Sequence, residues 1–253
     1  MTSPPTESQR TPTETHERRP VPMTSSETPL VAQVNASRVR TRREEVANSL
    51  SHGFGFLAAL VAVPVLVTAA VSTGEVSRVL SALAFGLAIV LVFAASSLYH
   101  GLPGGRAKRF FEFVDNAAIF LLIAGTYTPF TVVLIRGTLG WTLFGLVWGL
   151  ALVGVVLTMA GDLRYPAITA GLCLVMGWLG IMAIRQLSVV LPPVGQVLLW
   201  GGGLAYTIGV VFYSARRLRY HHLIWHLLVL VGASCHFLAI YWYAVGTMDL
   251  PSA

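Results

Sequence analysis

The sequence predicts an all-α integral membrane protein with seven transmembrane helices. Of its 253 residues, 55% are hydrophobic and 11% are charged, whereas a soluble domain carries about 25% charged residues. The mean hydropathy is +0.71. Apolar runs of roughly 20 residues, the length that crosses about 30 Å of hydrocarbon, occur between short polar breaks. The predicted spans are 50–72, 77–100, 113–135, 139–160, 166–186, 194–214 and 222–245.

The regions outside these spans differ in composition. Residues 1–37 are rich in Pro, Ser, Thr and Glu, a composition that predicts a disordered cytoplasmic tail. They contain no apolar stretch typical of a signal peptide, so we expect the first span to act as an uncleaved start-transfer helix. Residues 38–49 form a basic, amphipathic lead-in to the membrane domain at 50–245. Residues 246–253 form a short extracytoplasmic tail.

The distribution of basic residues predicts the orientation, because short loops that contain them are retained in the cytoplasm. An inside N-terminus places eleven basic residues in the cytoplasm, against Arg78, Arg136 and Arg185 outside. The eleven are Arg38, Arg40, Arg42, Arg43, Arg106, Lys108, Arg109, Arg164, Arg216, Arg217 and Arg219. This bias, together with contact with anionic membrane lipids, explains the net charge of +6. A nucleic-acid partner is not needed to explain it. The single lysine lies in a polar linker, which excludes a retinal Schiff-base pump.

Polar side chains within the apolar runs mark the candidate site. Ser96 and His100 are four residues apart near the end of the second span, and His222 and His226 have the same spacing in the seventh. Residues at this spacing share a helix face. Asp115 is expected in the first turn of the third span, on the same side of the membrane. Ionisable groups at membrane depth predict a functional site, and three imidazoles with a carboxylate are suited to Zn²⁺.

Other polar residues have weaker assignments. His236 lies about 15 Å from His226 along the helix, too far to share a metal held at about 2.0 Å, so we expect a hydrogen-bonded packing or ligand-lining residue. His221 is about 100° round the helix from His222 and is predicted to face the loop. Asn48 and His52 share a face and could orient a metal ligand, although helix capping and polar packing would also explain them.

Structural explanations exist for the candidate residues as well. A lone buried histidine is usually a packing residue. Ser96 could return its hydroxyl to the carbonyl four residues earlier. Asp115 could be a charge that complements a helix N-terminus, or a partner of Arg106 or Arg109. In the third span, Pro129 removes a backbone donor and predicts a kink.

At these residues the sequence resembles the hemolysin III proteins of bacteria, which are related to the progestin and adipoQ receptors. The segments that carry the resemblance are Glu44–Ser49 with His52, Ser96–His100, Asp115, Ala124–Pro129, and His222–His226 through Cys235–Phe237. The resemblance implies an adiponectin receptor-like bundle with an inside N-terminus. It also implies a zinc ion held by His100, His222 and His226 near the cytoplasmic face, with Asp115 beside the zinc's water and Ser96 close by.

Function can be narrowed to three classes. The family is similar to the alkaline ceramidases, which suggests hydrolysis of a lipid amide or ester. Three neutral ligands leave the fourth zinc position open to water, whose pKa zinc lowers to about 7. Asp115 would then act as general base and Ser96 as oxyanion donor. A haemolytic or channel-like protein, and a non-catalytic zinc-stabilised sensor of membrane homeostasis, are the alternatives. The absence of a polar stripe on any span argues against a simple pore.

Membrane lipids are the expected partners, and a bacterial plasma membrane is the expected location. The sequence leaves the oligomeric state open.

Overall fold

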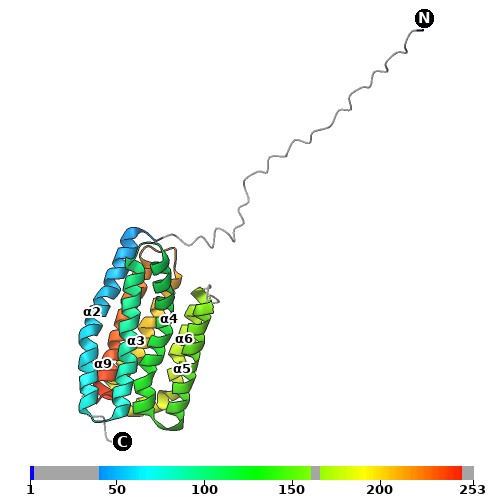
Figure 1. Ribbon diagram of the computed structural model, residues 1–253. Helices are drawn as coiled ribbons and strands as arrows, with labels where there is room; N and C mark the ends of the chain where they lie inside the picture. The colour runs from blue at the N-terminus through cyan, green and yellow to red at the C-terminus, as the bar shows by residue number, and fades with distance from the viewer. Residues whose placement is uncertain (3–39, 161–165, 247–253) are drawn as a thin grey trace. The chain divides into compact units, whose positions relative to one another are not determined.

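The computed structural model describes residues 1–2, 40–160 and 166–246, and every regular element in these ranges is a helix (Figure 1). Apart from Met1, Thr2 and Gly246, the tails predicted at 1–37 and 246–253 lie outside the described residues. The α-helices are α2 (Arg42–Ser72), α3 (Val76–Gly101), α4 (Arg106–Thr128), α5 (Gly137–Ala160), α6 (Pro166–Trp178), α7 (Ile184–Val190), α8 (Pro193–Ser214) and α9 (His221–Ala239). The π-helices η1 (Pro129–Ile135) and η3 (Ile240–Ala244) extend α4 and α9, and the 3₁₀-helix η2 (Leu179–Ala183) joins α6 to α7.

Within the described residues, seven helical segments are long and apolar enough to cross a membrane. The first is longer than predicted, because α2 begins at Arg42 and includes most of the expected lead-in. A capping box starts the helix: the Glu44 N–H donates to the Thr41 hydroxyl at 3.3 Å, and the Thr41 N–H donates to the Glu44 carboxylate at 2.8 Å. The residues that follow therefore lie on a continuous helix that leads into the bundle.

The third span also begins earlier than predicted. Its helix α4 starts at Arg106, so the prediction that Asp115 occupies the first helical turn is wrong. Asp115 lies nine residues further on, about 13 Å along the axis. Hydropathy assigned residues 101–109 to a loop and began the span at residue 113, but residues 106–112 belong to the helix. Asp115 is consequently too far from the helix N-terminus for the dipole to explain it.

Three spans depart from regular α-helix, the third at η1, the fifth at η2 and the seventh at η3. In the third span, α-helix gives way to π-helix at Pro129, the proline at which a kink was predicted. In the fifth, α6 changes to the 3₁₀ segment η2 after Trp178. The Tyr127 hydroxyl donates to the Gly177 carbonyl at 2.8 Å and accepts from the Gly180 N–H at 2.7 Å. Tyr127 thus fastens this break to α4.

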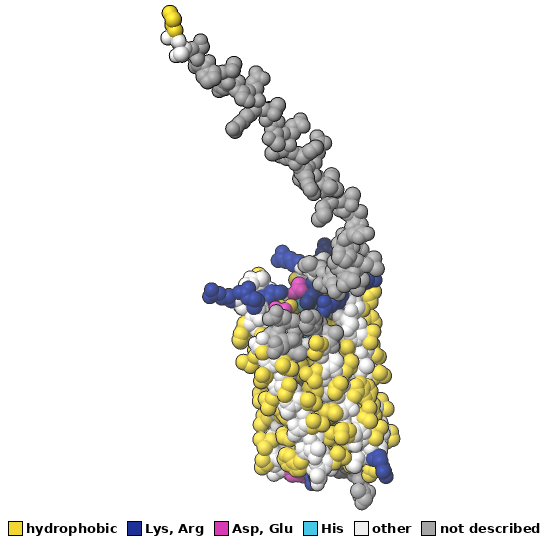
Figure 2. Space-filling view, turned by 90° about the vertical axis from the view of Figure 1, so that its right-hand side faces the viewer, with side chains coloured by type: hydrophobic (Ala, Val, Ile, Leu, Met, Phe, Trp, Pro, Cys, Tyr) yellow, Lys and Arg dark blue, Asp and Glu magenta, His cyan; other side chains and the backbone are white. Residues whose placement is uncertain are grey.

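The helices pack mainly on their neighbours in sequence: α2 on α3, α3 on α4, α4 on α5, and α8 on α9. In addition, α9 returns to pack against α2. The interior is apolar, and large hydrophobic side chains also cover the outside of the bundle, as expected for helices surrounded by lipid. Figure 2 shows this apolar side surface, with Lys and Arg side chains gathered at one end. Examples of exposed apolar residues are Leu57, Leu87 and Val197.

Close packing of α3 against α4 sets the register that the site depends on. A Cβ atom at Gly125 would lie 2.8 Å from the Ala84 carbonyl oxygen, so only glycine permits this approach of the two backbones. Because the helices run in opposite directions, the same register brings Ser96 level with Asp115. The chain directions also place the end of α3 beside the beginnings of α2 and α9 (Figure 1).

Candidate metal centre

Three histidines from two helices meet at one end of the bundle. His100 is in the last turn of α3, and His222 and His226 occupy the first two turns of α9. One ring nitrogen from each lies within 4.8 Å of the other two, and the group is buried. His100 and His226 are only 3% and 1% exposed. It is the only such group of three potential ligands among the residues that the structure describes.

The spacing of the rings matches a tetrahedral metal site. The Nε2 atoms of His100 and His222 are 3.2 Å apart. Two nitrogens bound tetrahedrally to zinc at about 2.0–2.1 Å would be separated by about 3.3–3.4 Å. The ring centroids of the three histidines are 4.7–4.9 Å from one another. An N–H···N hydrogen bond would explain the distance between His100 and His222. It would not explain why the His226 ring lies against both of them.

Hydrogen bonds on the outer side of two rings determine which nitrogen faces the centre. His100 Nδ1 lies 3.1 Å from the Glu45 carboxylate, and His226 Nδ1 lies 3.2 Å from the Asn48 carbonyl oxygen. The Ser51 hydroxyl, also 3.2 Å from His226 Nδ1, donates to the Asn48 carbonyl at 2.8 Å. These partners therefore accept from the rings, and each Nδ1 carries the proton. Each Nε2 then keeps its lone pair for a ligand. Such outer hydrogen bonds are the usual way in which proteins orient metal-bound histidines.

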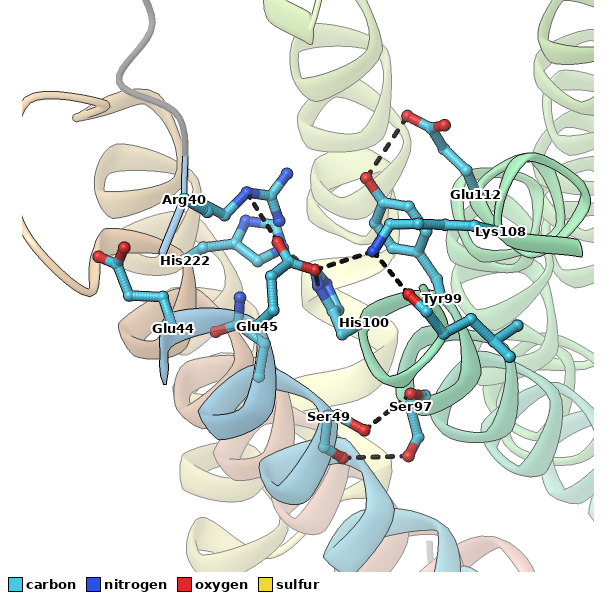
Figure 3. Close-up of polar contacts among 12 residues, drawn as sticks. Arg40, Glu44, Glu45, Ser49, Ser97, Tyr99, His100, Lys108, Glu112 and His222 are labelled. Atoms are coloured by element: carbon cyan, nitrogen blue, oxygen red, sulfur yellow. Dashed lines mark hydrogen bonds and ion pairs between the residues drawn. The ribbon is translucent and has the colours of Figure 1, made fainter. Parts of the chain in front are cut away.

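Glu45 is a site residue that the sequence analysis missed. Its carboxylate contacts His100 and also lies 3.2 Å from Lys108 Nζ and 3.5 Å from Arg40 Nε, as Figure 3 shows. From the sequence, this residue looked like an ordinary acidic residue near the start of a helix. The available signal was its spacing: Glu45 and Ser49 are four residues apart, and Ser49 pairs with Ser97 of α3. Glu45 therefore faces α3 at the level of His100.

Asp115 on α4 lies beside Ser96, which is one helical turn before His100 on α3. Ser96 is 1% exposed, and its side chain lies beside the half-buried Asp115 carboxylate. The contact with Ser96 takes the place of the ion pair considered with Arg106 or Arg109. The carboxylate is outside the group of atoms within 4.8 Å of one another. The roles predicted for Ser96 and Asp115 in catalysis stay predictions.

Asn48 and His52 adjoin the histidine group from α2. The His52 ring stacks on His226 with a centroid distance of 3.7 Å and an interplanar angle of 13°. The Asn48 main chain accepts the His226 hydrogen bond. The side chains of both residues are buried. The positions of Asn48 and His52 thus agree with the prediction that they support the ligands. Their side chains, however, make no hydrogen bond to a ligand.

The two remaining histidines of α9 are not part of the group. His221 is 9% exposed, and its ring centroid lies 6.0 Å from that of His222. His236 donates from Nε2 to the Leu199 carbonyl at 3.0 Å. It is therefore a hydrogen-bonded packing residue, as predicted.

Seven apolar helices around a buried group of three histidines define a multi-pass membrane protein that could hold a metal ion. The family model described as Haemolysin-III related matches residues 40–237, and the chain belongs to this family. The matched range includes every site residue discussed above.

Named relatives cover most of the chain. It is 38% identical over 205 residues to the Hemolysin-3 homolog of Bacillus subtilis (strain 168), which covers 81% of this chain and 96% of the relative. Identity to Hemolysin-3 of Bacillus cereus is 36% over 205 residues, or 81% and 94% of the two chains. The human monocyte to macrophage differentiation factor is 25% identical over 218 residues, covering 84% and 89%.

Proposed function

We propose that the protein binds Zn²⁺ through Nε2 of His100, His222 and His226 and hydrolyses a lipid amide or ester. The observation that carries the proposal is the convergence of three histidine rings, two of which have Nδ1 committed to an outer acceptor. Three neutral nitrogen ligands are typical of a catalytic zinc site, which keeps one position open. A structural site would use a fourth protein ligand, and the described residues supply none within the group.

The remaining polar residues have roles that follow from their contacts. Zinc, when bound, supplies Lewis acidity that activates a water molecule and polarises a carbonyl group. Asp115 would accept the proton released by that water, as a general base. Ser96, which lies beside Asp115, would donate a hydrogen bond that holds the carboxylate in position. Glu45 would keep His100 oriented and offset the positive charge of the site.

A lipid substrate is supported by the location of the site. The histidines lie on helices whose outer surfaces are apolar, so a ligand within the bilayer would have the shortest path to them. We propose a cytoplasmic orientation for this end, in a bacterial plasma membrane, because Lys and Arg side chains gather there (Figure 2). The described basic residues at this end are Arg40, Arg42, Arg43, Arg106, Lys108, Arg109, Arg216, Arg217 and Arg219.

The proposal is tested by elemental analysis of the purified protein together with a panel of lipid amides and esters. We expect about one zinc per chain in the wild type, loss of zinc in His222→Ala, and retention of zinc without turnover in Asp115→Asn. His221→Ala is the matched control, because it removes the adjacent histidine outside the group, and it should keep the metal. A folded wild-type protein that contains no zinc would refute the metal site. Zinc without turnover on any member of the panel would refute the hydrolase.

Membrane lysis is a second candidate, because two of the relatives are named hemolysins. It makes a different prediction. Reconstituted protein should release a dye from liposomes, and the leakage should persist in His222→Ala and in the presence of a chelator. Leakage that disappears with the metal would instead connect lysis to the zinc site.

A further inference from the structure

Two buried polar side chains on the inward face of α2 lack hydrogen-bond partners. Asn48 and His52 are 1% and 3% exposed. Neither the Nδ2 and Oδ1 atoms of Asn48 nor the two ring nitrogens of His52 have a partner within the described part of the chain. Although the His52 ring approaches the main chain of His226, it does so without a hydrogen-bond geometry. Four polar atoms are therefore left unsatisfied side by side.

The neighbouring residue on the same helix provides a contrast. The Ser49 hydroxyl donates to the Ser97 carbonyl at 2.9 Å, and the Ser97 hydroxyl donates to the Ser49 carbonyl at 3.0 Å. Polar packing between α2 and α3 is thus fully satisfied one position away. Capping does not explain Asn48 either, because it lies six residues after Arg42, where α2 begins. The two structural explanations considered for this pair do not apply.

Unsatisfied polar groups at this depth are costly, since an apolar interior offers no replacement for water. They persist in native proteins mainly where an ordered water or a ligand completes them. Here they adjoin the metal centre. The His52 ring is stacked on His226 at 3.7 Å, and Phe93 contacts it edge-on at 5.1 Å. The Asn48 main chain orients His226.

The positions of the helices separate this pair from the proposed base. Asp115 lies on α4, whereas Asn48 and His52 lie on α2, and both helices pack against α3. A substrate whose reacting group lies at the metal would therefore meet the base on one side and the unsatisfied pair on the other. The pair can contact a part of the substrate next to the group that reacts.

We propose that Asn48 and His52 form a polar subsite that binds the amide N–H of the lipid substrate. This inference rests on the proposed function and specifies its substrate class. The carboxamide offers two donors and an acceptor, and a neutral imidazole offers one of each. A ligand that both donates and accepts satisfies such a pair. An ester without a hydroxyl only accepts, so it would leave the Asn48 Oδ1 atom and one His52 nitrogen unpaired.

The subsite is tested by binding, without turnover, to the purified full-length protein. The probes are N-butyl lauramide and butyl laurate, which differ only in the N–H group. The wild type should bind the amide about 10- to 100-fold more tightly, the selectivity expected when a site would otherwise keep an unpaired buried acceptor. Asn48→Leu should reduce this preference to within about threefold. His52→Phe, which keeps the ring stack on His226, should reduce it as well.

Stability provides an independent readout. Asn48→Leu removes unsatisfied atoms, so its melting temperature should equal or exceed that of the wild type. Ser49→Ala, the matched control, removes a satisfied hydroxyl and should lower the melting temperature while leaving the amide preference intact. The subsite is refuted if the wild type binds both probes equally or binds neither, or if both variants keep the preference. Because zinc content and hydrolysis do not enter these measurements, failure of the proposed function would be seen separately.

Discussion

Replacement of Glu45 by glutamine tests whether this residue orients a metal ligand. The carboxylate accepts a hydrogen bond from His100 Nδ1 at 3.1 Å, and it is also paired with Lys108 and Arg40. Glutamine has nearly the same shape but no charge. It can also present its NH₂ group to His100, which would favour the tautomer that carries its proton on Nε2. That tautomer cannot bind a metal at the centre.

The magnitude follows from the type of contact. Removing a hydrogen-bond partner of a metal-bound histidine costs about 10- to 100-fold in metal affinity, or about 1.4–2.7 kcal/mol. The Glu45 side chain is 22% exposed, so solvent screens part of its charge. We therefore expect a loss of zinc affinity nearer to tenfold in Glu45→Gln, and a larger loss in Glu45→Ala.

Competition between the purified protein and chelators of graded zinc affinity measures this change. Glu112→Gln is the matched control, because Glu112 is an exposed carboxylate at the same end of the bundle that contacts the Tyr99 hydroxyl and no histidine. Its zinc affinity should stay within about twofold of the wild type. If Glu45→Gln and Glu112→Gln both bind zinc as tightly as the wild type, Glu45 does not orient His100. If both weaken binding equally, the effect is one of overall charge.

Three further predictions concern the bundle. Gly125→Ala should destabilise the protein by about 1–3 kcal/mol, because its Cβ would lie 2.8 Å from the Ala84 carbonyl oxygen. The control is Gly145→Ala, where nothing lies within 4 Å of the added Cβ, and it should be neutral or stabilising. Equal melting temperatures for the two variants would contradict this packing. Tyr127→Phe should lower the free energy of unfolding by about 1 kcal/mol, because the break between α6 and η2 loses both hydrogen bonds with the Tyr127 hydroxyl. Reversible unfolding measures this change. His236→Leu should lower stability by a similar amount and leave zinc content unchanged; loss of zinc would place His236 at the metal.

Much of the fold could be predicted from local sequence. Seven apolar runs predicted seven spans, because hydrocarbon thickness sets a minimum length that short-range composition reveals. The ends were less accurate. The segments that begin α2 and α4 are polar, and hydropathy cannot tell a polar helical turn at the membrane surface from a loop. Because of this error, Asp115 was predicted in the first turn of α4, although α4 begins nine residues before it.

The candidate site, like the fold, could be predicted only in part from local sequence. Helical spacing alone placed Ser96 with His100, and His222 with His226, since residues four apart share a face. The meeting of these pairs depends on how α3 packs against α9, which the resemblance to a family implied but no local pattern could show. The contacts of Glu45 with His100, and of Ser96 with Asp115, were beyond prediction for the same reason.

The sequence by itself thus determined the membrane spans and which histidines share a helix face, because each depends on residues within a few turns of one another. Only the tertiary structure decided which ring nitrogen faces the centre, which carboxylate orients a histidine, and that Asn48 and His52 are buried without partners. These properties depend on the rotation and register of helices far apart in the chain, which side-chain packing across the bundle sets.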